Sequence, residues 1–370
     1  MKEILRHRLL WPVVALIAII AINAATRPTF LSITVRDGQL YGALIDILRN
    51  SAPLMLIALG MTLVIATRGI DLSVGAVMAV SGAVALTIID RSDTPHSLST
   101  VMFAIFIAVL VSLALGAWNG FLVSVLGIQP IVATLVLMLA GRGIALLITG
   151  GFITTVNSDP YRFMAQGYIF GLPFAFYVSV VAIAIVALVE RRTALGMLTE
   201  AVGINPKASR LAGVRSLGIV LGAYIACGTL SGIAGILYSS NIMAADANAA
   251  GLFIELYAIL AVVMGGTSLT GGKFSIAGTV IGVFTIQTLI STVTFLGVPP
   301  AASPVFFAAA VIIVVLLQSS RVHRAGRRLA RTLGAHRGPA VRDAAHVGTV
   351  TRSDPEPDNT SAQDDTKVAP

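Results

Sequence analysis

Charged residues are scarce in this sequence. Asp, Glu, Lys and Arg make up 11% of its 370 residues, whereas 56% are hydrophobic. Soluble domains carry about 25% charged residues. With this few charged residues there is too little polar surface to enclose the apolar residues in water. An ordinary soluble domain is therefore excluded, and lipid is the predicted solvent. Because a helix that crosses a bilayer uses about 20 residues, the chain up to residue 320 accommodates about ten spans.

The groups that build disulfides, metal sites and hydrolytic sites are also nearly absent. The single cysteine, Cys227, excludes an intramolecular disulfide and is predicted to be a small core residue. The five histidines lie in predicted loops or termini, and neither H-E-x-x-H nor C-x-x-C occurs. The sequence therefore predicts no catalytic residue, no metal site and no cofactor, and a chain that is not an enzyme.

Apolar runs and basic residues together predict an all-α integral membrane protein. The net charge is +8, but the basic residues flank apolar segments, which argues against nucleic acid as a partner. The predicted spans lie near residues 9–26, 50–67, 72–89, 101–126, 131–149, 174–190, 216–238, 252–268, 274–296 and 302–320. With the N-terminus in the cytoplasm, alternation leaves few basic residues outside, namely Arg27, Arg36, Arg49, Arg91 and Arg162. Both termini are therefore predicted to be cytoplasmic.

This topology divides the chain into a cytoplasmic N-terminus (1–8), a transmembrane domain (9–320) and a basic, then disordered, cytoplasmic tail (321–370). The halves formed by spans 2–5 and 7–10 begin on opposite faces, which allows an inverted repeat. Glycines four residues apart within spans predict close helix packing. These pairs are Gly116/Gly120, Gly218/Gly222, Gly228/Gly232 and Gly278/Gly282.

Few polar groups of functional interest fall inside or beside the spans, namely Asp71, Asn119, Arg142 and Glu255. Asp71 is expected to cap the next helix, with Arg68 as its partner. Arg142 needs a carboxylate or carbonyl partner, and Glu255 is one candidate. Each group either lines a translocation path or forms an internal polar tie. They are too isolated to form the relay that an ion-driven carrier needs.

The connection 190–215 is the main predicted cytoplasmic feature. Asn205 fits a helix N-cap, Pro206 the first helical position and Gly213 a left-handed helix stop. The pattern predicts a short helix with a surface of small and basic residues on which another protein can pack; a solvated loop is the alternative.

The glycine-rich segment 265–275, GGTSLTGGKFS, is not an ATP-binding loop. A phosphate loop ending in Gly272-Lys273 needs glycine at position 267 and Ser or Thr at position 274, where this chain has Thr267 and Phe274. The segment is predicted to be a tight turn between two spans.

Four stretches carry a specific resemblance. EAVGINPKASRLAGV in the 190–215 connection resembles the loop by which permeases of ATP-binding-cassette importers dock on their ATPases, in the ribose-type sugar permease family. GMTLVIATRGIDLSVGAVMAVSG (60–82), IQPIVATLVLMLAGRGIALLITGG (128–151) and ADANAAGLFIELYAILAVVMGGTSLTGG (245–272) agree in order and spacing. The likeness covers about residues 40–320, and DGQLYGALIDILRNSAPLMLIALGMTLVIAT is similar to galactofuranose-importer permeases.

The resemblance implies a permease subunit that forms the path for a monosaccharide, such as galactofuranose or ribose, across the bacterial inner membrane. It implies three partners: a separate ATPase, expected as a tandem cassette, a second permease copy or paralogue, and a periplasmic or lipid-anchored sugar-binding protein. The residues that it assigns to the ATPase-coupling loop are Glu200, Gly203, Asn205, Pro206, Ala208 and Gly213.

Two residues depart from the family pattern. Arg68 stands where such permeases usually have a small residue, and Tyr257 stands where an acidic residue often follows the match to Glu255.

The alternative function is an ion-coupled secondary sugar transporter or a channel that works without an ATPase.

Overall fold

The computed structural model describes residues 9–299, 302, 305–306, 308–309 and 312. Helices dominate this part of the chain. Their bounds are α1 Leu10–Thr26, η2 Pro28–Leu31, α2 Ala43–Ala66, α3 Val74–Asp90, α4 Leu98–Ser124, α5 Pro130–Ile148, α6 Asp159–Gln166, α7 Phe174–Arg192, α8 Ala194–Ile204, α9 Pro206–Leu211, α10 Ser216–Ile242, α11 Ile254–Met264 and α12 Ile276–Phe295.

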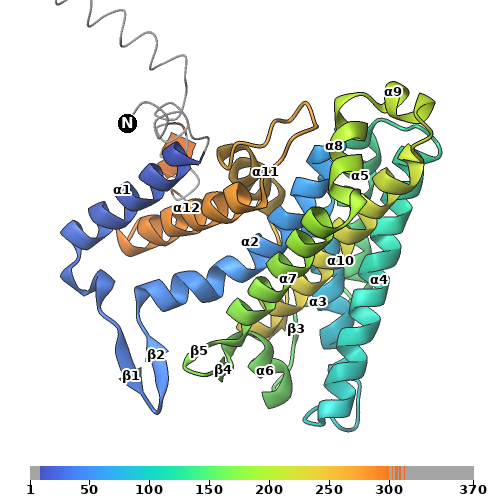
Figure 1. Cartoon of the computed structure of the whole chain (residues 1–370). Coiled ribbons are helices and arrows are strands. Elements are labelled where there is room, and N and C mark those ends of the chain that lie inside the picture. The colour runs from blue at the N-terminus through green and yellow to red at the C-terminus, as the bar shows by residue number, and fades with distance from the viewer. Residues whose placement is uncertain (1–8, 300–301, 303–304, 307, 310–311, 313–370) are drawn as a thin grey trace, which may run out of the picture. The chain divides into compact units, whose positions relative to one another are not determined.

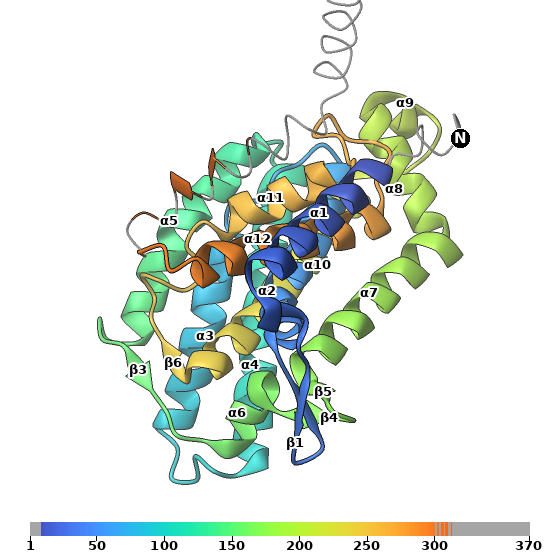
Figure 2. The same cartoon turned by 90° about the vertical axis from the view of Figure 1, so that its left-hand side faces the viewer.

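Short antiparallel strand pairs occur in the connections. Their bounds are β1 Thr34–Arg36, β2 Gln39–Tyr41, β3 Thr154–Thr155, β4 Tyr168–Ile169, β5 Leu172–Pro173 and β6 Ala244–Ala245. β1 pairs with β2 and β4 with β5 in local hairpins, whereas β3 pairs with the distant β6 through Thr154 and Ala245. Both hairpins lie at the end of the helices opposite α9 (Figures 1 and 2).

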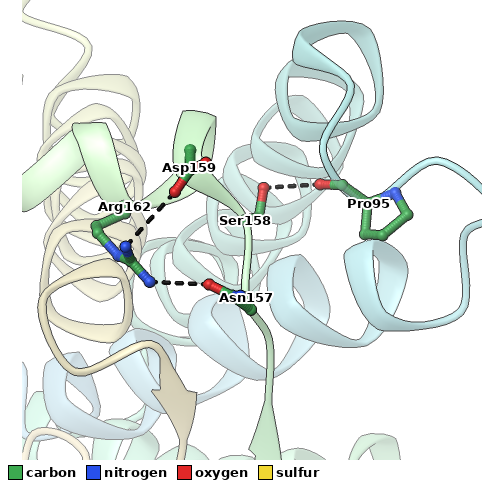
Figure 3. A network of polar contacts seen from close by, with 5 residues as sticks. All are labelled: Pro95, Asn157, Ser158, Asp159 and Arg162. Carbon is green, nitrogen blue, oxygen red and sulfur yellow. Dashed lines mark hydrogen bonds and ion pairs between the residues drawn. The ribbon is translucent and has the colours of Figure 1, made fainter.

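At the end opposite α9, the chain before α6 is tied to the connection between α3 and α4. The Ser158 hydroxyl donates to the Pro95 carbonyl at 2.7 Å, while Arg162 donates to Asn157 at 2.8 Å and pairs with Asp159 at 3.5 Å (Figure 3). These contacts fix the connection that carries the chain from β3 into α6.

The core forms around α2 and α10. From Leu54 to Ala66 every residue of α2 is buried, and α10 packs against α2, α3 and α4. The helices α4, α5 and α7 instead expose large apolar side chains, such as Phe103, Leu139 and Val181. Exposed apolar helix faces of this kind suit a lipid surround, as the composition predicts.

Small residues allow the central helices to approach closely. A Cβ built on Gly228 would lie 2.6 Å from the Gly116 Cα, so these two helices, α10 and α4, touch backbone to backbone. Gly278 and Gly282 of α12 meet Gly265 and Ala261 in the same way. The predicted packing role is confirmed for these pairs but not for Gly218/Gly222, where no heavy atom of another part of the chain lies within 4 Å.

Within the described residues, six helices are long and apolar enough to cross a membrane: α2, α4, α5, α7, α10 and α12. The shorter apolar helices are α1, α3, α8 and α11. The predicted eighth span, 252–268, is helical only from Ile254 to Met264, because Phe253 before it and Gly266 after it have left-handed backbones with φ +63° and +89°. Most of the predicted span 302–320, and segments 1–8 and 321–370, lie outside the described residues.

Candidate functional site

The connection 190–215 folds into two helices, α8 and α9, at one end of the molecule (Figure 1). The Asn205 side chain accepts from the backbone N–H groups of Lys207 and Ala208, both at 3.1 Å, and Pro206 is the first residue of α9. Gly213 has the left-handed φ of +85° expected of a helix stop. The predicted caps of the short helix are therefore present.

Glu200 and Gly203 do not belong to this short helix. They lie on α8, a second helix that the sequence analysis missed. Its N-cap is Thr193, whose side chain accepts from the Leu195 N–H at 3.2 Å. A threonine before the run ALGMLTEAVGI is a recognisable start signal. Hydropathy alone could not separate this helix from the end of α7, because only Thr193 lies between them.

The C-terminal end of α8 is in close contact with two other connections. The Arg68 guanidinium donates to the carbonyls of Gly203 and Ile204. The Gly272 N–H donates to the Ala66 carbonyl at 2.9 Å. We call the residues Ala66, Arg68, Gly203, Ile204, Gly271 and Gly272 the α8 junction. The sequence analysis predicted that Arg68 pairs with Asp71. This prediction was wrong, because the Arg68 side chain caps the last carbonyls of α8 instead.

Asp71 and Asn119 form a buried polar cluster between α2, α3 and α4. Asp71 is 1% exposed and accepts from the Ser73 N–H at 2.9 Å and the Ser73 hydroxyl at 2.6 Å. Asn119 donates to the Ser73 hydroxyl at 2.8 Å and lies 3.5 Å from the Asp71 carboxylate. The prediction that Asp71 caps the next helix was wrong, because α3 begins at Val74 and the carboxylate reaches only the amide two residues along.

Arg142 holds the chain between β6 and α11. Its guanidinium donates to the carbonyls of Ala247 at 2.8 Å, Asn248 at 3.3 Å and Ala250 at 2.6 Å. No ion pair forms with Glu255 among the described residues, although that carboxylate and Asp246 attract the guanidinium at longer range. The sequence analysis predicted a carboxylate or carbonyls as the partner of Arg142, and in the structure its hydrogen-bond partners are carbonyls.

Glu255 lies where the starts of α3 and α11 meet. It is 5% exposed, and its Oε2 would lie 2.9 Å from a Cβ built on Gly75, the second residue of α3. A Cβ on Gly251 would in turn lie 2.8 Å from the Gly75 carbonyl oxygen, so only glycines allow this approach. The carboxylate therefore faces two helix N-termini, whose partial positive charge stabilises it.

The predicted polar groups thus form separate sites. Asp71 and Asn119 share one cluster. Arg142 bonds to the connection between β6 and α11, and Glu255 lies in the first turn of α11, with no ion pair between the two in the described residues. In the described residues no group of three or more His, Cys, Asp or Glu side chains comes together as a metal site would require.

Sequence comparisons identify a family and several relatives of the chain. A family described as "Branched-chain amino acid transport system / permease component" matches residues 43–316. The fructose import permease protein FruF of Bifidobacterium longum is 42% identical over 328 residues, covering 87% of this chain and 90% of the relative. The galactofuranose transporter permease protein YtfT of Escherichia coli is 43% identical over 325 residues, covering 85% and 92%. The ribose import permease protein RbsC of E. coli is 35% identical over 289 residues, covering 77% and 85%. No solved structure matches the chain.

Six apolar helices long enough to cross a membrane, with the capped helices α8 and α9 at one end, fit an integral membrane protein. The chain belongs to the permease-component family that matches residues 43–316. It is a multi-pass inner-membrane protein and a transport component rather than an enzyme, and the ATPase of such importers is a separate subunit.

Proposed function

We propose that the chain is the permease subunit of an ATP-driven importer and forms the path for a monosaccharide of the fructose, galactofuranose or ribose class. The observation that carries this proposal is 42–43% identity to two sugar import permeases over at least 85% of the chain. The family description names amino acids instead, but the relatives reported above are named for sugars.

The proposed topology has ten spans, with both termini in the cytoplasm and the tail 321–370 extending from the last span. It is supported by the positive-inside distribution of Lys and Arg. The α2–α3 and α11–α12 connections also lie at the same end as α9 (Figures 1 and 2), as cytoplasmic connections must. The meeting of Gly75 with Gly251, one from each half of the chain, supports an inverted repeat.

The α8–α9 pair is the proposed contact for an ATP-binding-cassette ATPase, expected as a tandem cassette. The caps of α9 at Asn205 and Gly213 support this assignment, because they hold a two-turn helix rigidly at the end of the bundle. Glu200, Gly203, Pro206 and Ala208 belong to the same contact. A second permease copy or paralogue and a periplasmic or lipid-anchored sugar-binding protein complete the proposed assembly.

Asp71, Asn119, Arg142 and Glu255 are proposed as internal polar ties rather than as the lining of the sugar path. The hydrogen bonds given above for Asp71, Asn119 and Arg142 all run to this chain's own groups, and Asp71, Asn119 and Glu255 are buried. A charge inside a membrane is stable only with such partners.

Reconstitution tests the function. The permease, its candidate ATPase and the binding protein are incorporated into liposomes, and uptake of labelled fructose, galactofuranose and ribose is measured with and without ATP. The expected result is uptake of one of these sugars only when ATP and ATPase are both present. Uptake by this chain alone, driven by an ion gradient, would establish the secondary-carrier alternative.

A further inference from the structure

The α8 junction joins three segments that are far apart in the sequence. Ala66 is the last residue of α2 and Arg68 lies just after it in the α2–α3 connection. Gly203 and Ile204 end α8, and Gly271 and Gly272 lie between α11 and α12. Figures 1 and 2 show the three segments meeting at the end of the molecule that carries α9. The junction therefore connects the α8–α9 pair to one connection from each half of the chain.

The backbone segments of this junction are closely packed. A Cβ built on Gly203 would collide with the Ala66 carbonyl oxygen and lie 2.5 Å from the Gly272 nitrogen. A Cβ on Gly271 would collide with the Arg68 side chain. Contacts this tight transmit displacement, because packed backbone does not deform gradually.

Arg68 is the side chain that fastens the junction. Its two donors grip consecutive carbonyls, Gly203 and Ile204, in the forked geometry that only a guanidinium provides. Its own backbone has φ +69°, a left-handed conformation that glycine adopts freely and arginine does not. The surrounding contacts therefore hold this arginine in an unfavourable backbone conformation.

By contrast, α9 does not lie tightly on the core at every point. Pro206 and Arg210 of α9 line a cavity of about 160 Å³ whose other side includes Gly69 and Tyr224. The Tyr224 hydroxyl and the Ser124 hydroxyl, which also borders the cavity, are buried without a hydrogen-bond partner in the described residues. A displacement of α9 is therefore transmitted to the core through the closely packed α8, whereas the cavity lets α9 move against Gly69 and Tyr224 without shifting them.

We propose that Arg68 is a positioning residue that locks α8 to the α2–α3 and α11–α12 connections, so that the ATPase moves both halves of the permease together. This proposal rests on the proposed function, because the displacement comes from an ATPase docked on the α8–α9 pair.

The decisive variant is Arg68→Gly. It removes both guanidinium hydrogen bonds and also relieves the left-handed backbone, so folding is not expected to suffer. In the reconstituted complex, ATPase binding and hydrolysis should persist, whereas sugar transported per ATP should fall by about three- to tenfold. Arg68→Lys keeps the charge with a single donor group and should give an intermediate ratio.

Gly203→Ala disrupts the junction at its α8 residue and should also lower the amount of sugar transported per ATP. Its matched control is Gly218→Ala on α10, because a Cβ there meets no heavy atom within 4 Å and its ratio should equal that of the unchanged complex. If Gly203→Ala does not fold, Arg68→Gly still decides the question.

A distance measurement separates coupling from mere stability. Spin labels are placed on cysteines introduced at Met197 of α8 and Thr270, both exposed, while the buried Cys227 stays unlabelled. The label-to-label distance should stay constant between nucleotide-free and ATP-bound complexes, and should vary between them in Arg68→Gly. The proposal would be overturned if, in Arg68→Gly, the label-to-label distance stayed the same in the nucleotide-free and ATP-bound complexes and the sugar transported per ATP equalled that of the unmodified complex. Absence of ATP-driven uptake in the unmodified complex would instead refute the proposed function.

Discussion

Arg142 illustrates how a single charge is accommodated within a membrane helix. One guanidinium nitrogen, Nη1, shares its two N–H groups among three backbone carbonyls of the segment 247–250, which has no regular helix or strand of its own. Carbonyls that lie away from water need donors. Arg142 therefore stabilises an irregular segment that would otherwise expose unpaired backbone groups.

Arg142→Leu is expected to destabilise the protein by about 3 kcal/mol, because three carbonyls lose a charged donor. The thermal unfolding midpoint of the purified protein in detergent should fall by several degrees. Arg142→Lys is the control: it keeps the charge and one donor nitrogen, as the contacts from Nη1 require, and its midpoint should fall less. A Leu variant as stable as the unchanged protein would mean that the carbonyls do not depend on this side chain.

The sequence located the polar residues within or beside the spans but did not identify their partners. Arg142 could be flagged because a charge in an apolar run is costly, yet its acceptors are backbone carbonyls about 105 residues away in sequence. Arg68 was expected to pair with Asp71, three residues away, but instead caps α8. Side-chain identity is local information, whereas a partner across the fold depends on tertiary packing.

At the scale of the element, α9 was predictable because its signals are local. An asparagine, a proline and a glycine at fixed offsets define a helix start and stop within one short segment. α8 was missed and α11 was predicted too long, because apolar composition reports burial in lipid or protein and not where a helix ends.

Asn205→Ala removes the cap of α9, which costs about 1 kcal/mol of local stability. A six-residue helix has little else to hold it, so α9 should fray and the ATPase should co-purify less well with the permease. Asn205→Asp keeps a capping oxygen and should restore co-purification. Equal recovery of ATPase with Asn205→Ala and the unchanged permease would separate α9 from docking.

The glycine contact between α4 and α10 predicts a different outcome for two similar substitutions. Gly228→Ala places a methyl group 2.6 Å from the Gly116 Cα and should push the two helices apart, at a cost of about 2 kcal/mol. Gly222→Ala, on the same helix but with no heavy atom of another part of the chain within 4 Å, should leave stability unchanged or slightly raised. Thermal unfolding of the two variants in detergent measures the difference. Equal midpoints would show that the backbones can separate without cost.

At the scale of the whole molecule, the apolar composition and the alternation of connections were predictable, because both follow from the bilayer. Nine of the ten predicted runs coincide with described helices, of which six are long enough to span and three, α1, α3 and α11, are shorter; most of the tenth, 302–320, lies outside the described residues. The difference arises where the chain forms irregular turns beside the core helices, such as 67–73 and 246–253, whose boundaries with the helices hydropathy does not resolve.

Sidedness can be tested directly with introduced cysteines, because Cys227 is buried. Arg36→Cys in β1 should react with a membrane-impermeant maleimide in intact spheroplasts, since β1 is assigned to the outer face. Thr270→Cys, in the α11–α12 connection, should react only after permeabilisation. The reverse pattern would invert the proposed topology.

The central place of α10 has a consequence for synthesis in the membrane. The Ser81 hydroxyl of α3 donates to the Gly232 carbonyl of α10 at 2.7 Å, and Gly116 of α4 packs on Gly228. The ribosome delivers α3 and α4 long before α10, so these polar and glycine-lined faces first meet lipid alone. Insertion of the early helices and their final assembly are therefore separate events in time. A chain interrupted before residue 216 would present an unpaired surface for membrane proteases to recognise.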